Sequence, residues 1–247
     1  MHADEARPRL AALGFRPEDV ETLAAHFVDA EARGSLGHGL SRIEWLETWD
    51  EIDTQARPVR VVAEPGYERW DGNGALGYLT LAAAIDAQLA DPPATARVVV
   101  CSRTFPTGAL GYWVRLLAEG GLVGLLTATS PRRLPPPGGG DPLAGTNPIA
   151  IAIPSGDGRP VVSDVSMGAV THGAVLAGLA RPEELVPFGG EQSHKAFALA
   201  VGLQLLVDAL VPDEGFGAVL LVARPQADPV PALRSLAAGV RLPGDRR

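Results

Sequence analysis

Apolar positions recur along the chain at two spacings, one typical of helices and one typical of strands. Between residues 17 and 33 they return every three to four residues, with Pro17 in the first turn, acidic residues after it and Gly34 as the stop. This pattern predicts an amphipathic helix that buries one stripe of side chains. A second helix, carrying Trp45 and Trp49, is predicted to follow it.

Short runs rich in valine, isoleucine and leucine predict strands in the remainder of the chain. Strands that alternate with helices define an α/β fold. The stretch 134–140 has the composition of a linker, although the strand that follows so closely is equally compatible with an ordered loop. The predicted strands are 59–63, 98–101, 122–128, 149–153, 161–165 and 219–223, and the predicted helices between them are 79–89, 111–119 and 195–210.

Composition and charge exclude several classes of protein. The chain has 247 residues, 46% of them hydrophobic, and a net charge of −8 without a basic cluster, which argues against a nucleic-acid partner. Cys101 is the one cysteine, so a reducing cytoplasm is the expected location. No apolar run approaches the roughly 20 residues that span a bilayer, so no membrane is expected as a partner.

A glycine motif at residues 72–77 matches G-x-G-x-x-G, a pattern typical of dinucleotide-binding turns. Two features argue against that function. The predicted strand ends near Ala63, with eight residues between it and Gly72, and Ser102-Arg103 stands where a ribose-binding acidic residue is expected after the next strand. A structural turn at the start of a helix is therefore preferred.

His38 lies between two glycines, four residues before Arg42. On a helix start this spacing places an imidazole and a guanidinium on one face, as an acid/base beside a carboxylate anchor requires. A loop histidine next to a solvated arginine is the alternative. His26 is predicted to be structural, His172 and His194 stay open, and no metal-ligand spacing is present in the sequence.

Taken together, these segments resemble the malate/L-lactate dehydrogenase family, whose fold differs from the Rossmann fold. The most specific stretch is 143–154, Leu-Ala-Gly-Thr-Asn-Pro-Ile-Ala-Ile-Ala-Ile-Pro, which resembles the L-G-T-N-P-I-A signature of that family. The sole lysine of the chain, Lys195, and one of its two asparagines, Asn147, both fall at matched positions. The other matched segments are 31–42, 70–77, 102–112, 119–124, 162–164, 187–199 and 240–245.

The resemblance implies a mixed β-sheet with flanking helices and an NAD- or NADP-dependent oxidoreductase, commonly homodimeric, acting on a small carboxylate-bearing substrate. That substrate is a 2-oxo acid, a 2-hydroxy acid or a cyclic imino acid. His38 and Arg42 are implied as the catalytic residues, with His38 as the acid/base, and Arg42 and Asn147 are implied as substrate-binding residues. Arg103 suggests a slight preference for NADPH. The cofactor-binding residues that the resemblance implies are Ser102, Gly108, Thr146, Asn147, Asp164 and Lys195.

The chain also departs from this family. Gly37 stands where the family has the serine of S-H-G, and the histidine of S-x-H-x-G has no counterpart between Ser102 and Gly108. The segment between His172 and Gly189 is much shorter than in relatives. These departures leave a second hypothesis open: a cofactor-free enzyme for proton transfer, lyase or cyclisation chemistry, or a ligand-binding relative, in a specialised biosynthetic pathway.

The sequence is expected to divide into three parts. Residues 1–58 form an N-terminal helical segment that carries the Gly-His-Gly motif, residues 59–225 form the central mixed α/β core, and residues 226–247 form a C-terminal segment that returns toward the N-terminal part.

Overall fold

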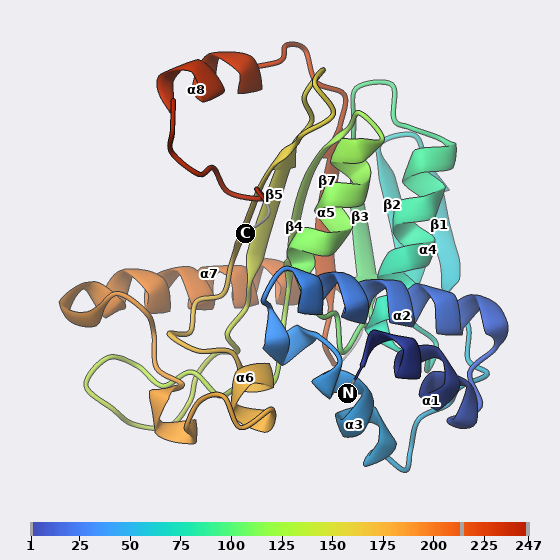
Figure 1. Cartoon of the computed structure of the whole chain (residues 1–247), viewed down its shortest axis with the longest axis vertical. Coiled ribbons are helices and arrows are strands. Elements are labelled where there is room, and N and C mark those ends of the chain that lie inside the picture. The colour runs from blue at the N-terminus through green and yellow to red at the C-terminus, as the bar shows by residue number, and fades with distance from the viewer. Residues whose placement is uncertain (1, 213–214, 246–247) are drawn as a thin grey trace.

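A single seven-stranded sheet organises the protein (Figure 1). The computed structural model describes residues 2–212 and 215–245. The strand order is β1-β2-β3-β7-β4-β5-β6, in which β2 and β3 pair in parallel and every other neighbouring pair is antiparallel. This mixed sheet confirms the predicted fold class. The strands are β1 (Val59–Glu64), β2 (Tyr67–Asp71), β3 (Ala96–Ser102), β4 (Val123–Ala128), β5 (Ile149–Ile153), β6 (Val161–Val165) and β7 (Ala218–Ala223).

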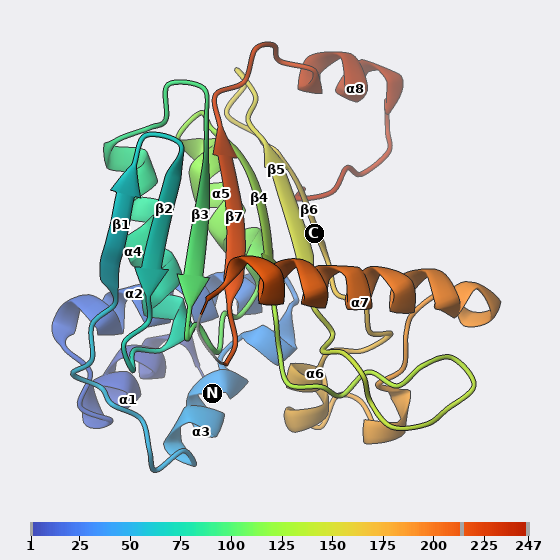
Figure 2. The same ribbon diagram turned by 180° about the vertical axis from the view of Figure 1, so that it is seen from behind.

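Helices cover both faces of this sheet. The helices α2, α4 and α5 lie over one face, and α7 crosses the opposite face (Figures 1 and 2). The main core fills the space between the sheet and the first of these layers, with Phe27, Tyr78 and Trp113 fully buried. The helices are α1 (Ala6–Ala12), α2 (Pro17–Ala32), α3 (Ser41–Glu47), α4 (Gly77–Ala90), α5 (Leu110–Glu119), α6 (His172–Leu176), α7 (Ser193–Leu210) and α8 (Val230–Leu236).

Strand β2 is an element that the sequence pattern did not predict. Its residues alternate between partly and fully buried positions, as expected for a strand, but one buried position is Glu68. The carboxylate of Glu68 is satisfied inside the protein, 3.2 Å from the guanidinium of Arg97 and accepting a 3.0 Å hydrogen bond from Trp70 Nε1. A buried charge with partners elsewhere in the chain hides the apolar alternation that marks a strand.

Strand β2 places the glycine motif at residues 72–77 directly after a strand. Because β2 ends at Asp71, the motif directly follows a strand, so the objection based on its distance from a strand was wrong. The glycines nevertheless serve close backbone packing. A Cβ on Gly72 would collide with the carbonyl of Arg103, and one on Gly77 would lie 2.6 Å from the carbonyl oxygen of Pro106. The preferred structural role of this turn therefore agrees with the backbone contacts.

Helix α7 differs from the other helices because much of its apolar surface is exposed. The stretch Gly190–Leu210 is long and apolar enough to cross a membrane by length and composition, so the expectation that no apolar run approaches this length was wrong here. Within the described residues it is the one such helix, and 22% of its most apolar window is buried. Its buried side chains, such as Val207, pack against the back of the sheet.

The C-terminal segment folds back onto the sheet and onto the end of α2. Val162 N on β6 donates a 3.1 Å hydrogen bond to Pro243 O, and Arg33 Nη1 donates a 3.2 Å hydrogen bond to Gly244 O.

Strand direction determines where the connecting loops meet. The pairing pattern makes β2, β3, β4 and β6 run in one direction, so their carboxyl ends lie at the same edge as the starts of β5 and β7. Side chains from distant parts of the chain therefore converge at this edge.

Candidate active site

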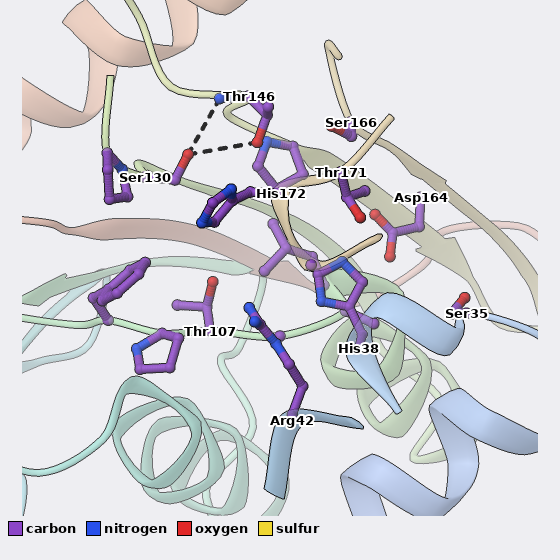
Figure 3. A pocket seen from close by; sticks show the side chains of 18 of the residues that line it. Ser35, His38, Arg42, Thr107, Ser130, Thr146, Asp164, Ser166, Thr171 and His172 are labelled. Atoms are coloured by element: carbon purple, nitrogen blue, oxygen red, sulfur yellow. Dashed lines mark hydrogen bonds between the residues drawn. The ribbon is translucent and has the colours of Figure 1, made fainter. Parts of the chain in front are cut away.

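A cavity of about 210 Å³ opens at the edge where these loops meet (Figure 3). Its walls come from the segment after α2, the loop between β3 and α5, the loops that join β4 to β5, the end of β6 and the start of α6. Five of the predicted site residues line it: His38, Arg42, Gly108, Thr146 and Asp164.

Backbone packing between two glycines holds His38 at the cavity. His38 ends a 3-10 turn, Leu36–His38, which contacts α6. A Cβ on Gly37 would lie 2.8 Å from the carbonyl carbon of Gly173, and one on Gly173 would collide with the carbonyl of Gly37. Glycine at position 37, where the resembled family has serine, therefore permits a contact that a side chain would block.

His38 is held as a neutral imidazole. Burial and, to a smaller degree, the neighbouring charge of Arg42 lower the pKa of His38 to about 4. Its Nδ1 atom is buried without a hydrogen-bond partner in the described structure. A neutral imidazole can accept a proton at pH 7, as a general base requires.

Arg42 is a buried cation without a carboxylate partner among the described residues. The side chain projects from α3, and the residue is only 7% exposed. Its Nε and Nη1 atoms have no hydrogen-bond partner, while its guanidinium lies 4.6 Å from the ring centre of Trp45. Because an unpaired buried donor costs free energy, this guanidinium is suited to an anionic ligand that completes its hydrogen bonds.

The loop between β3 and α5 is anchored by a second buried histidine. His26 on α2 is fully buried, and its Nε2 accepts a 3.2 Å hydrogen bond from Ala109 N. Its ring stacks on Trp113, whose indole Nε1 donates a 2.8 Å hydrogen bond to Thr107 O. These contacts agree with the structural role predicted for His26, and they fix one wall of the cavity.

Asn147 supports the cavity from behind and does not line it. It is fully buried, and its Nδ2 donates 3.0 Å hydrogen bonds to Ala200 O and Gln204 Oε1. Its Oδ1 accepts a 3.2 Å hydrogen bond from Ser130 N, and its φ of 24° lies in the region that asparagine tolerates. Asn147 thereby positions Ser130 and Thr146, whose hydroxyl groups do line the cavity.

Asp164 lies where the first cavity meets a second one of about 380 Å³. Its Oδ2 accepts a 2.7 Å hydrogen bond from Gly111 N in the first turn of α5. Burial raises the pKa of Asp164, and this hydrogen bond opposes the rise. Ser35 and Ala109 also line both cavities, so the two spaces adjoin.

Three further residues singled out from the sequence lie away from the first cavity. Ser102 is buried at the end of β3, and its Oγ donates a 3.4 Å hydrogen bond to Trp70 O. Lys195 is exposed in the first turn of α7. Arg103, the basis of the NADPH preference, hydrogen-bonds Asp71 through Nε at 2.9 Å and is likewise outside this cavity.

The structure adds residues that the sequence left open or did not single out. His172, at the start of α6, points into the cavity from the wall opposite His38 and Arg42 (Figure 3). Burial, followed by the charges of Arg133 and Arg42, lowers the pKa of His172 to about 4. Arg133 lines the same cavity. No local spacing connects these positions with His38, so the sequence contained no signal for their meeting.

The buried histidines predict a loss of stability in mild acid. The folded-state pKa values of His26 and His38 lie below the usual 6.5, so the unfolded chain binds more protons as the pH falls from 6.5 toward 4. Their stabilising contribution is present above pH 6.5 and falls by up to about 1.4 kcal/mol per pH unit for each histidine. Urea denaturation at pH 7 and pH 5 measures this. His38→Gln should flatten the dependence, and the exposed His194→Gln should match the unmodified protein; identical slopes in all three would contradict the assignment.

The fold and the site together define a protein with a small pocket at one edge of a mixed sheet, suited to a small organic anion. Residues 3–184 match the malate/L-lactate dehydrogenase family, and the chain belongs to that family. The chain is 32% identical over 219 residues to the Δ1-pyrroline-2-carboxylate/Δ1-piperideine-2-carboxylate reductase of Pseudomonas putida, covering 76% of this chain and 63% of the relative. It is 31% identical over 176 residues to the (2R)-3-sulfolactate dehydrogenase (NADP+) of Chromohalobacter salexigens, covering 68% and 51%.

Solved structures confirm the fold. The Δ1-piperideine-2-carboxylate reductase of Pseudomonas syringae superposes with a TM-score of 0.83 at 26% identity, covering 99% of this chain and 89% of that one. The malate dehydrogenase of Entamoeba histolytica gives the same TM-score at 19% identity, covering 99% and 86%. The chain spans less than two thirds of the length of the first curated relatives it matches, 63% and 65%.

Proposed function

We propose that this protein is an NAD(P)-dependent oxidoreductase that transfers hydride to or from a small 2-oxo or 2-hydroxy acid or a cyclic imino acid. The observation that carries the proposal is the pairing of His38 with Arg42 in one cavity. Arg42 offers a buried guanidinium with unused donors to a carboxylate. His38 offers an imidazole to the oxygen or nitrogen on the neighbouring carbon. Relatives whose names state reduction or dehydrogenation of such acids support the same assignment.

Substrate binding and proton transfer are coupled through the charge of Arg42. That charge helps to keep the pKa of His38 near 4 in the free protein. A substrate carboxylate on Arg42 cancels the charge, so the pKa of His38 rises when substrate binds. In oxidation the neutral imidazole accepts the hydroxyl proton; in reduction the protonated imidazole returns it to the product.

The residues around the cavity fit a nicotinamide group. The hydroxyls of Ser130 and Thr146, the backbone at Gly108 and the carboxyl of Asp164 supply hydrogen-bonding groups beside His38, and the adjoining second cavity extends the space available. When bound there, the nicotinamide would supply or accept the hydride. Ser102 and Asn147 would position the walls of this cavity. Lys195 would contact a part of the cofactor that lies outside it.

Titration with NADH and NADPH tests the proposal directly. We expect at least one of them to raise the melting temperature and to change nicotinamide fluorescence, because a ligand that binds the folded state stabilises it by mass action. Comparing the affinities for NADH and NADPH decides the cofactor preference; Arg103, which hydrogen-bonds Asp71, is the residue that favours NADPH. If neither NADH nor NADPH gives a response at millimolar concentration, nicotinamide use is rejected and the cofactor-free alternative is favoured.

We also propose that the protein is a cytoplasmic homodimer. The exposed apolar side chains on α7 support a self-association surface: Leu199, Leu205, Leu206 and Leu210 are 46%, 61%, 44% and 43% exposed. The free, buried Cys101 is compatible with a reducing compartment. Sedimentation velocity and cell fractionation test the two statements.

A further inference from the structure

The cavity contains a second cation that the proposed chemistry does not use. Arg133 follows β4 in the loop toward β5, lines the same cavity as Arg42, and has no ion pair or side-chain hydrogen bond in the described part of the chain. Burial, and then the nearby charge of Arg42, lower the pKa of Arg133. Two guanidinium groups therefore line one small space, and neither forms an ion pair with a carboxylate of the described residues.

The backbone around Arg133 gives its side chain a defined direction. The backbone N–H groups of Arg133 and Leu134 both donate to Ala144 O, at 3.0 and 2.9 Å. Leu134 is fully buried in a cluster with Met167, Ala144 and residues of α7, whereas the preceding Arg132 is exposed. Arg133 is thus held at the cavity by a buried neighbour, and Arg132 provides an adjacent arginine outside it.

The other lining groups form no ion pair with the guanidinium of Arg42 or Arg133 among the described residues. His38 and His172 are neutral at pH 7, and Asp164 is the one acidic residue among those that line the cavity, where it accepts the hydrogen bond from Gly111 N. One monoanionic substrate supplies one carboxylate, which Arg42 takes. The Arg133 guanidinium is then left in a confined site without an anionic partner, and a second anionic group on the substrate supplies one.

We propose that Arg133 binds a second anionic group of the substrate, so that this protein prefers dianionic 2-oxo or 2-hydroxy acids to monoanionic ones. The inference rests on the proposed function and narrows its substrate class. Sequence similarity does not make this choice, because the names of relatives at 31–32% identity include both a sulfolactate and a cyclic imino acid with one carboxylate. The second anion is a carboxylate or a sulfonate at the end of the chain opposite the 2-oxo acid group.

Matched substrate pairs test the preference. Oxaloacetate with 2-oxobutanoate, and 2-oxoglutarate with 2-oxopentanoate, differ only by a terminal carboxylate in place of a methyl group. We expect kcat/KM to favour the dianion of at least one pair by about 10- to 100-fold, which corresponds to about 1.4–2.8 kcal/mol. Arg133→Leu should reduce that ratio to near one and change the monoanion rate only a few-fold, with Arg133→Lys intermediate. Arg132→Leu should leave the ratio unchanged.

Three results would overturn the inference. They are a ratio near one in the unmodified protein, a ratio that Arg133→Leu does not alter, and an Arg133→Leu effect that raises the KM of NADH or NADPH equally with every substrate. The last result would assign Arg133 to a cofactor phosphate. Circular dichroism and the melting temperature verify that each variant is folded.

A binding measurement separates this inference from the proposed function. Succinate and butanoate form the corresponding pair without a reactive carbonyl, and calorimetry with them requires neither cofactor nor turnover. If succinate binds more tightly than butanoate and this difference is lost in Arg133→Leu, the second anion site is supported, whether or not the enzyme turns over. If, in addition, no 2-oxo acid oxidises NADH or NADPH, only the proposed hydride transfer is rejected. Equal binding of succinate and butanoate, unaltered in Arg133→Leu, would reject the second anion site whatever the enzyme turns over.

Discussion

Replacing His38 with glutamine is expected to lower kcat by about 10²- to 10⁴-fold, the range typical of losing a general acid/base. Glutamine retains hydrogen-bonding capacity and approximate size but does not exchange a proton. KM should change much less, because Arg42 would still hold the carboxylate. Steady-state kinetics with the accepted cofactor and substrate, from pH 5 to pH 9, measure both the loss of kcat and the loss of the His38 ionisation from the pH profile.

His194→Gln is the matched control for this variant, because His194 is exposed in the first turn of α7 and lines none of the cavities described above. Its kinetics should equal those of the unmodified protein. If His38→Gln keeps both its turnover and its pH profile, another group moves the proton. His172, which faces the same cavity, would then be the next residue to replace.

Replacing Arg42 with methionine is expected to weaken substrate binding by about 10²- to 10³-fold without destabilising the free protein. This loss of substrate-binding free energy, about 3–4 kcal/mol, is expected because the substrate carboxylate no longer has its buried cation. The stability expectation follows from the unpaired Nε and Nη1 atoms, because methionine removes two buried donors that have no partner. The lost contact with Trp45 opposes this gain. The net expected change in the free energy of unfolding is between zero and a gain of about 2 kcal/mol.

Urea denaturation and substrate titration on the same preparation test both halves of this expectation. Arg9→Met is a suitable control, since Arg9 is ion-paired with Glu47 on the surface away from the cavity and should affect neither substrate binding nor the cavity. Clear destabilisation by Arg42→Met would show that the guanidinium serves the fold. Unchanged substrate binding would show that the carboxylate is held elsewhere.

Residues with strong local signals were predicted correctly from the sequence. The helix expected at 17–33 is observed as Pro17–Ala32, and the strand expected at 149–153 is observed with the same bounds. In both elements the spacing of apolar side chains within the element itself is enough to predict a helix or a strand. The weaker pattern of β2 was missed because Glu68 occupies a buried position, and its partner Arg97 lies 29 residues further along the chain.

For the candidate site, the sequence determined which chemical groups are available, and the tertiary structure decided which of them lie in the same cavity. His38 and Arg42 are four residues apart, so local geometry already predicts that they act together, and the resemblance to the dehydrogenase family supplied the rest of the expected set. Arg133 and His172 enter the same cavity only because the strand directions bring the end of β4 and the start of α6 to one edge of the sheet. Asn147 is held behind the wall by hydrogen bonds to α7, more than 50 residues away in the chain. Contacts between residues that are far apart in the sequence depend on how whole helices and strands pack, so the spacing of residues along the chain does not predict them.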